Sequence, residues 1–345
     1  MSARASTVAP APARSGSPKR WILWIAAMRA WLFLALLLIL FEVWARASYG
    51  TSFIFSSYNA QSIAIFAVAP LLLALGETFV IIAGGIDLSV GFIMGLSAVI
   101  AAQATNATTG SLPGFAAMLV GVLAGLAVAI IPGLINGALI SKLKVPPFIG
   151  TLGMFGVARG AAFLLANGTT VPVSNDWFAW IGNGRIGGFP IIVLITAAFV
   201  LGMSYLLSQT RFGQHTYAVG ASEQAALRAG IGVGRHTRKL YLLSALCAGL
   251  GGVLYAARFT AGAAQAGEPL LLDSIAAVVI GGASLFGGSG TILGTVAGSL
   301  VIAVIQYGLV FIDVEPFWQF VAVGVVIIIS VLVDQTQRRL GGERH

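Results

Sequence analysis

Apolar stretches of about 20 residues recur along the whole chain, separated by short polar segments. A helix of that length crosses the roughly 30 Å hydrocarbon layer of a membrane. Backbone in that layer must satisfy its own hydrogen bonds, and no alternating barrel pattern is present, so helices are favoured over strands. The 44 glycines suit a membrane bundle, where small residues let helices approach closely. The sequence therefore predicts an all-α, polytopic membrane protein.

The hydrophobic pattern places about ten transmembrane helices in the chain. A Pro-, Ser- and Ala-rich segment at 1–20 is expected to be a disordered cytoplasmic N-terminus, 21–335 a transmembrane domain, and 336–345 a cytoplasmic tail. An even number of spans puts both termini on one side. The expected spans are 30–47, 60–83, 87–104, 114–140, 148–166, 189–207, 240–258, 270–287, 291–312 and 317–333.

Basic residues are distributed unequally between the two sides of this predicted topology. One side carries only Arg46, Arg185 and Arg258. The other carries fourteen: Arg4, Arg14, Lys19, Arg20, Lys142, Lys144, Arg211, Arg228, Arg235, Arg238, Lys239, Arg338, Arg339 and Arg344. The positive-inside rule makes this richer side, with both termini, cytoplasmic. Because topology explains the basic residues, the net charge of +8 does not indicate nucleic-acid binding.

One long polar segment, 209–239, interrupts the apolar pattern near the middle of the chain. It holds five basic residues against a single acid, Glu223. Its centre, Ala221–Gly230, contains good helix formers and ends on a glycine, which is typical of a helix C-terminus. A short helix held outside the bilayer suggests a docking element for a soluble partner.

Two apolar segments are interrupted by glycine pairs in the same way. Gly84–Gly91 and Gly281–Gly288 share the pattern G-G-x-x-L-x-x-G and lie in opposite halves of the chain. Interrupted helices at matching places of two halves are typical of transporter repeats and lie near their permeation paths. Four matches in eight positions, mostly glycine, are by themselves a weak indication of a repeat.

Polar residues inside these apolar segments are candidate pathway residues, each with a structural alternative. Glu77 within a span is costly unless it is paired or faces water. Asp87 precedes the third span, so it either N-caps that helix or contacts a substrate. Asn136 and Gln306 either join helices by hydrogen bonds or bind a hydroxylated substrate.

Several classes of protein lack their characteristic residues in this chain. No G-x-x-x-x-G-K-[ST] phosphate loop is present. The three histidines, His215, His236 and His345, form no metal-ligand pattern, and no serine or cysteine has an evident base. We therefore expect no catalytic residue, no metal site and no bound cofactor in this chain.

Four stretches of the chain resemble the membrane permeases of ribose-type sugar ABC importers. They are Thr78–Gly91, Val145–Gly160, Tyr217–Val233 and Asp273–Gly298, in the family's order, and the resemblance extends over about 55–335. It implies a type II ABC importer-like permease of ten helices in the bacterial inner membrane, working as a homodimer or with a close paralogue. Two cytoplasmic ATPases, which bind ATP and Mg²⁺, and a periplasmic or lipid-anchored sugar-binding protein would be its partners.

The resemblance also implies roles for individual residues. The loop that docks on the ATPase would comprise Ala221, Ser222, Glu223, Ala225, Ala226, Leu227 and Gly230. Together with the broken segments and the polar residues within spans described above, the resemblance gives an expected substrate pathway of Glu77, Gly84, Gly85, Asp87, Asn136, Phe148, Thr151 and Gln306.

The chain departs from the family pattern in two places. Leu270–Leu272 stands where many members have an acidic residue, and Gln306-Tyr307 stands where a pair of asparagines is frequent. These departures leave the choice among pentoses, hexoses and polyols open. An ion-coupled secondary transporter that uses Glu77 and Asp87 is the alternative function, and a channel is a third.

Overall fold

The computed structural model describes residues 20–315 and 317–341 of the chain. Within these residues the fold is almost entirely helical. The helices are α1 (Arg20–Tyr49), α2 (Ser57–Ile82), α3 (Val90–Thr108), α4 (Gly114–Ser141), α5 (Pro147–Leu165), α6 (Asp176–Asn183), α7 (Ile191–Gln209), α8 (Arg211–Ala221), α9 (Glu223–Arg228), α10 (Val233–Phe259), α11 (Glu268–Ile280), α12 (Ile292–Phe311) and α13 (Phe317–Gly341). Four two-residue strands form two antiparallel pairs: β1 (Val171–Pro172) with β4 (Ala261–Gly262), and β2 (Arg185–Ile186) with β3 (Phe189–Pro190).

Eight helices of the described chain are long and apolar enough to span a membrane: α1, α2, α3, α4, α5, α7, α10 and α12. The expected count of ten is therefore not confirmed. The span expected at 270–287 is the clearest difference, because α11 has only 13 residues and ends at Ile280. Gly282 follows with φ +94°, a conformation that continues no right-handed helix and that glycine adopts at low cost. The apolar part described for α13 is Phe317–Ile329.

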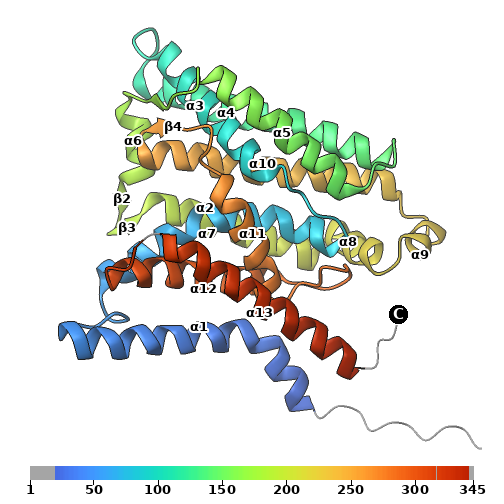
Figure 1. Ribbon diagram of the computed structural model, residues 1–345. Helices are drawn as coiled ribbons and strands as arrows, with labels where there is room; N and C mark the ends of the chain where they lie inside the picture. Colours follow the sequence, from blue (N-terminus) through green and yellow to red (C-terminus); the bar gives the residue numbers. More distant parts are fainter. Residues whose placement is uncertain (1–19, 316, 342–345) are drawn as a thin grey trace, which may run out of the picture.

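The helices lie side by side in one bundle, with α10 near its centre (Figure 1). α10 packs against α2, α3 and α4, and α12 packs against α1, α2 and α11. α1 forms one edge of the bundle and α4 and α5 the opposite edge. Much of the outward surface of α1, α4, α5 and α7 is apolar, as expected of helices that face lipid.

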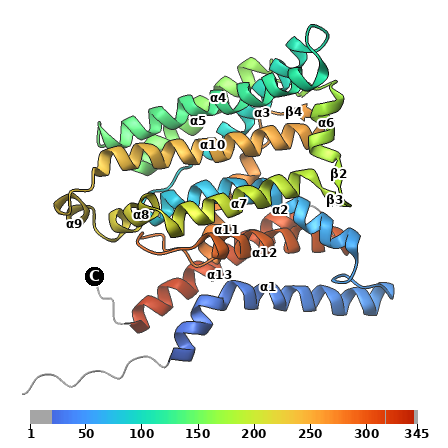
Figure 2. The same cartoon turned by 180° about the vertical axis from the view of Figure 1, so that it is seen from behind.

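The two ends of the bundle carry different connecting elements. α8 and α9 lie at one end, and α6 with the β2–β3 hairpin lies at the other, as both views show (Figures 1 and 2). We refer to these as the α9 end and the α6 end. α8 was not expected as a separate helix; Thr210 begins it by accepting a hydrogen bond from the backbone of Gly213.

A non-helical segment, 260–267, turns back from the α6 end of α10 into the bundle. It runs along α3 in very close contact, because a Cβ on Gly95 would lie 2.0 Å from the Ala264 carbonyl oxygen. Farther along, Gly267 meets Gly91 in the first turn of α3 in the same way. Irregular backbone is tolerated at membrane depth where protein covers it, and all of this segment except Gln265 is buried or half-buried.

Helix boundaries differ from the predicted spans mainly by extension. α1 begins at Arg20, α10 begins seven residues before the expected start, and α13 continues to Gly341 instead of ending in a tail at 336. The apolar pattern defines only the part of a helix in lipid, whereas polar turns continue the same helix beyond it. The expected disorder of 1–19 and the last part of the tail, 342–345, lie outside the described residues.

Candidate functional site

The break between α2 and α3 holds a buried carboxylate that joins three elements. Asp87 Oδ1 accepts hydrogen bonds from the backbone and hydroxyl of Ser89, and Oδ2 accepts one from the Ser244 hydroxyl of α10 at 3.0 Å. Asp87 therefore does not occupy the N-cap position of α3. α3 begins at Val90 with Ser89 at its cap position, and Asp87 instead stabilises the turn before it. Its hydrogen bonds hold the break against α10.

A second buried acid, Glu77 of α2, faces the same break. Glu77 Oε2 accepts the Asp87 backbone N–H at 3.4 Å, while Oε1 has no hydrogen-bond partner within the described chain. The Tyr241 hydroxyl and Asn136 Oδ1 are likewise buried without partners among these residues. A Cβ on Gly85 would lie 2.5 Å from the Tyr241 oxygen, so the phenol lies directly against the break. Burying polar atoms without hydrogen-bond partners costs free energy. These residues therefore indicate that the break has a role beyond packing the helices together.

The structure brings most of the expected pathway residues to this break. Asn136 Nδ2 donates to Ser89 Oγ at 2.8 Å. Thr151 Oγ1 lies 3.3 Å from the Ile86 carbonyl oxygen, although its nearest acceptor is the Pro147 carbonyl oxygen at 2.9 Å. Two expected residues lie elsewhere. The Phe148 side chain is 52% exposed. Gln306 lies on α12 and donates to Asp273 of α11 at 2.8 Å.

The second glycine-rich break, between α11 and α12, repeats the local structure of the first. α2 ends with Gly84 at φ +84° and a hydrogen bond from the Gly85 N–H to the Val80 carbonyl. α11 ends with Gly282 at φ +94° and a bond from the Ala283 N–H to the Val278 carbonyl. Both are Schellman-type helix ends. Gly84 thus matches Gly282 in space, one residue later than the sequence pattern aligns them.

The turns that follow the two helix ends are also alike. Ser284 Oγ accepts the Phe286 backbone N–H at 3.1 Å, as Asp87 Oδ1 accepts that of Ser89 at 3.1 Å. A short polar side chain thus stabilises the turn two residues ahead in both halves of the chain. The two likenesses differ by one residue in register, because Asp87 lies three residues after Gly84 and Ser284 only two after Gly282, so they show similar local turns and do not by themselves establish a repeat.

The two breaks meet each other at the end of α8. The Gly288 N–H donates to the Ile82 carbonyl at 2.8 Å, and the Tyr217 hydroxyl of α8 donates to the Gly290 carbonyl at 2.7 Å. A Cβ on Gly220 would lie 1.7 Å from the Ile82 oxygen, so only glycine permits this approach. A displacement of α8 therefore acts on both breaks at once.

α9 is the short helix expected in the polar segment, and both of its ends are capped. Ser222 accepts the Ala225 backbone N–H at 3.2 Å, and Gly230 follows the helix with φ +81°. The Ile231 N–H returns to the Ala226 carbonyl, which completes a Schellman-type end. Local sequence therefore defines this six-residue helix, and its protruding position is visible in both ribbon views (Figures 1 and 2).

The side chains of α9 divide into one buried residue and an exposed surface. Ala226 is 3% exposed and packs with Val219 and Val233 in a small cluster that attaches α9 to the bundle. Ala226 is thus covered by Val219 and Val233 in this chain, and its direct contact with a partner stays a prediction. Leu227 is 54% exposed, and Ala221, Ser222, Glu223, Ala225 and Gly230 are also exposed.

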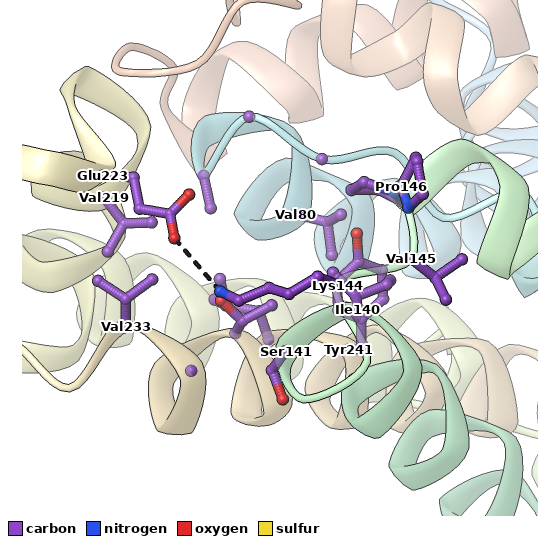
Figure 3. Close-up of a pocket in the computed structure, with 17 residues that line it drawn as sticks. Val80, Ile140, Ser141, Lys144, Val145, Pro146, Val219, Glu223, Val233 and Tyr241 are labelled. Atoms are coloured by element: carbon purple, nitrogen blue, oxygen red, sulfur yellow. Dashed lines mark ion pairs between the residues drawn. The ribbon is translucent and has the colours of Figure 1, made fainter.

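A cavity of about 320 Å³ separates α9 from the break after α2 (Figure 3). Val219 and Val233 line one side, and Gly84, Gly85 and Tyr241 line its inner part. Lys144, in the α4–α5 connection, approaches Glu223 across it with a nitrogen–oxygen distance of 3.8 Å. Both side chains are largely exposed, so the pair contributes at most about 1 kcal/mol. The cavity therefore lies between the exposed helix α9 and the glycine turn, Gly84–Gly85, that precedes Asp87.

The sequence did not single out three residues of the break, Ser89, Tyr241 and Ser244, or Asp273 of α11, which lies outside the break. Serine and tyrosine in apolar helices are common, so nothing local distinguishes Ser244 from a residue that bonds its own helix. Asp273 was noted only as a matched position in the family resemblance. It is 5% exposed within α11, and an acid in an apolar helix was a signal that could have singled it out.

These features define a polytopic α-helical membrane protein with paired broken helices and a protruding helix at one end, the architecture of a transport permease. Residues 59–331 match the family model described as "Branched-chain amino acid transport system / permease component". The chain belongs to this family of transport-system permeases.

Relatives with named functions align over most of both chains. The ribose import permease protein RbsC of Escherichia coli K12 is 36% identical over 271 residues, covering 77% of this chain and 82% of its own. RbsC of Bacillus subtilis is 40% identical over 267 residues (76% and 80%), and the fructose import permease protein FrcC of Rhizobium meliloti is 38% identical over 272 residues (76% and 74%).

No metal-binding group of His, Cys, Asp or Glu is found among the described residues.

Proposed function

We propose that this protein is the membrane permease subunit of a binding-protein-dependent ABC importer that moves a monosaccharide or related polyol across the bacterial inner membrane. The observation that carries this proposal is the alignment with import permeases named for ribose, fructose, D-allose and galactose over about four-fifths of the chain. The family description names branched-chain amino acids, but the relatives cited here are named for sugars.

The α9 end is assigned to the cytoplasm. Lys142, Lys144 and the basic residues of 209–239 lie at this end, whereas Arg185 and Arg258 lie at the α6 end. The positive-inside rule favours this orientation. The α6 end then faces the sugar-binding protein, and α9 faces the ATPase subunits. A second copy of the chain or a close paralogue completes the importer.

The proposed mechanism is alternating access driven by the partner ATPases. Closure of the ATPase pair on ATP and Mg²⁺ moves α9, and the Ala226 cluster passes that motion to α8 and α10. Because Gly220 and Tyr217 of α8 contact the junction of the two breaks, the motion reaches the membrane interior. Broken helices are the elements best able to rearrange there, since their backbone is not held by a continuous hydrogen-bond ladder.

Reconstitution of the permease with its ATPase and binding protein in proteoliposomes tests this function. Radiolabelled ribose, fructose, allose and galactose are offered, and import of at least one is expected only with ATP inside and the binding protein outside. Collapse of the proton and sodium gradients should leave that import intact. Import that instead follows an ion gradient without ATP would establish the ion-coupled alternative, with Glu77 and Asp87 as its candidate ion-binding residues.

A further inference from the structure

A cavity of about 410 Å³ opens in the α6 half of the bundle, separate from the break between α2 and α3. It lies between α2, α10, α11, α12 and α13. Its volume falls in the roughly 300–1,000 Å³ range typical of small-molecule sites. The residues that matter here are Phe66, Tyr255, Asp273, Gln306, Gln319 and Phe320.

The polar part of this cavity is a carboxyl group held within the depth of the bundle. Asp273 lies in the second turn of α11, which starts after the segment 260–267 has run back along α3 as far as Gly91. Its side chain accepts the Gln306 amide at 2.8 Å. Arg258 also lines the cavity but donates to Asn183, and no ion pair joins it to Asp273 among the described residues. An acid at this depth marks a polar pathway, because hydrocarbon would exclude it.

The apolar part is aromatic and accessible. Phe66 of α2 and Phe320 of α13 are 39% and 60% exposed, and Tyr255 of α10 lines the same cavity. Aromatic surfaces beside a carboxylate and two amides match a monosaccharide. The C–H face of a sugar ring packs on aromatic rings, and its hydroxyl groups donate to carboxylate and amide oxygens. If lipid alone filled the groove, the carboxyl group of Asp273 and the amide of Gln306 would face hydrocarbon, which is unfavourable.

We propose that this cavity receives the sugar from the binding protein at the α6 end, with Asp273 and Gln306 hydrogen-bonding its hydroxyl groups and Phe66 and Phe320 packing against its ring. The proposal rests on the proposed import function. The substrate class is a neutral, polyhydroxylated ring. Affinity is supplied elsewhere, so this site orients and admits the sugar and need not retain it.

Thiol labelling tests whether the cavity is aqueous. Phe66→Cys and Phe320→Cys are made in a Cys247→Ala background and treated in membranes with a charged, impermeant thiosulfonate or with a lipophilic maleimide. Leu201→Cys is the control, since Leu201 lies on the outer surface of α7 and is 72% exposed. We expect the cavity positions to react with the charged reagent from the α6 side and Leu201→Cys only with the lipophilic one. Reaction of all three with the lipophilic reagent alone would mean a lipid-filled groove and would overturn the proposal.

Uptake by the complete importer tests whether the cavity handles sugar. Gln306→Leu, Phe66→Leu and Asp273→Asn are compared with Phe115→Leu, an exposed aromatic outside the cavity. The probe is whichever of ribose, fructose, allose or galactose the unmodified importer takes up. Maximal uptake, divided by the amount of permease in the membrane, is expected to be at least tenfold lower for Gln306→Leu and Phe66→Leu and unchanged for Phe115→Leu. Uptake at the normal rate in both would refute the site, whereas an unmodified importer that takes up no sugar would refute the import function instead.

Discussion

The backbone N–H of Gly288 donates a hydrogen bond to the carbonyl of Ile82 at 2.8 Å, which joins the two broken helices of the chain directly. Ile82 is the last residue of α2, and Gly288 lies between α11 and α12. The unpaired carbonyls at a helix end normally need a cap or water. Here an N–H group from the second half of the chain satisfies a carbonyl at a helix end in the first half, so the two breaks form one structural unit.

Gly220 is expected to be essential to that unit. Gly220→Ala places a methyl group 1.7 Å from the Ile82 oxygen, so the junction must separate at a cost of about 1–3 kcal/mol. Gly202→Ala in α7 is the matched control, because nothing lies within 4 Å of its Cβ position. Thermal unfolding of the detergent-purified protein should show a lower midpoint for Gly220→Ala only. Equal midpoints would mean that α8 can move away from the Ile82 carbonyl without loss of stability.

The hydrogen bonds of Asp87 predict a graded response to substitution. In Asp87→Asn, the side-chain oxygen can still accept hydrogen bonds from Ser89, and the NH2 group can donate to the Ser244 hydroxyl oxygen. Folded yield should therefore remain close to normal. Asp87→Leu leaves three buried donors unpaired, each costing about 1–3 kcal/mol, and should accumulate poorly. Membrane abundance and uptake measure this. An Asp87→Asn protein that folds normally but does not transport would assign the charge itself a mechanistic role.

Glu77 is expected to need its hydrogen-bonding oxygen and not its charge. It is fully buried and receives only the Asp87 N–H within the described chain. Glu77→Gln retains that acceptor and removes a charge whose burial is costly. Uptake and thermal stability of Glu77→Gln should match the unmodified protein, whereas Glu77→Leu should be less stable. Loss of ATP-driven uptake in Glu77→Gln would contradict this expectation.

The two faces of α9 are expected to separate docking from stability. Leu227→Asp changes an exposed side chain, so the permease should retain its thermal midpoint but lose its co-purifying ATPase. Ala226→Asp places a charge in the cluster with Val219 and Val233 and should lower the midpoint itself. Gly230→Val introduces a β-branched residue at φ +81°, which costs about 1–2 kcal/mol. If Leu227→Asp keeps its ATPase and normal uptake, α9 is not the coupling helix.

Single-cysteine labelling is expected to establish the orientation of the bundle. Ile186→Cys at the α6 end and Gln224→Cys on α9 are suitable positions, because both native side chains are exposed. In a Cys247→Ala background, an impermeant reagent should label Ile186→Cys from the periplasm and Gln224→Cys only after the membrane is opened. The reverse result would invert the topology inferred from the basic residues.

Local and compositional signals determined the class of this protein. Apolar length indicates spans because hydrocarbon thickness is nearly constant, and basic residues indicate a side because their transfer is costly. The C-terminal end of α9 was also readable, since Gly230 acts on its immediate neighbours. These properties depend on residues close together in the chain, so no knowledge of packing is needed to recognise them.

Only the tertiary structure decided what the polar residues of the spans contact. Ser244 reaches Asp87 across 157 positions of sequence, and Gln306 meets Asp273 instead of joining the break. The inward position of Ala226 likewise depends on packing, here against Val219 and Val233. Side-chain partners in a helical bundle follow from crossing angles and close glycine contacts, which a single sequence specifies only through the complete fold.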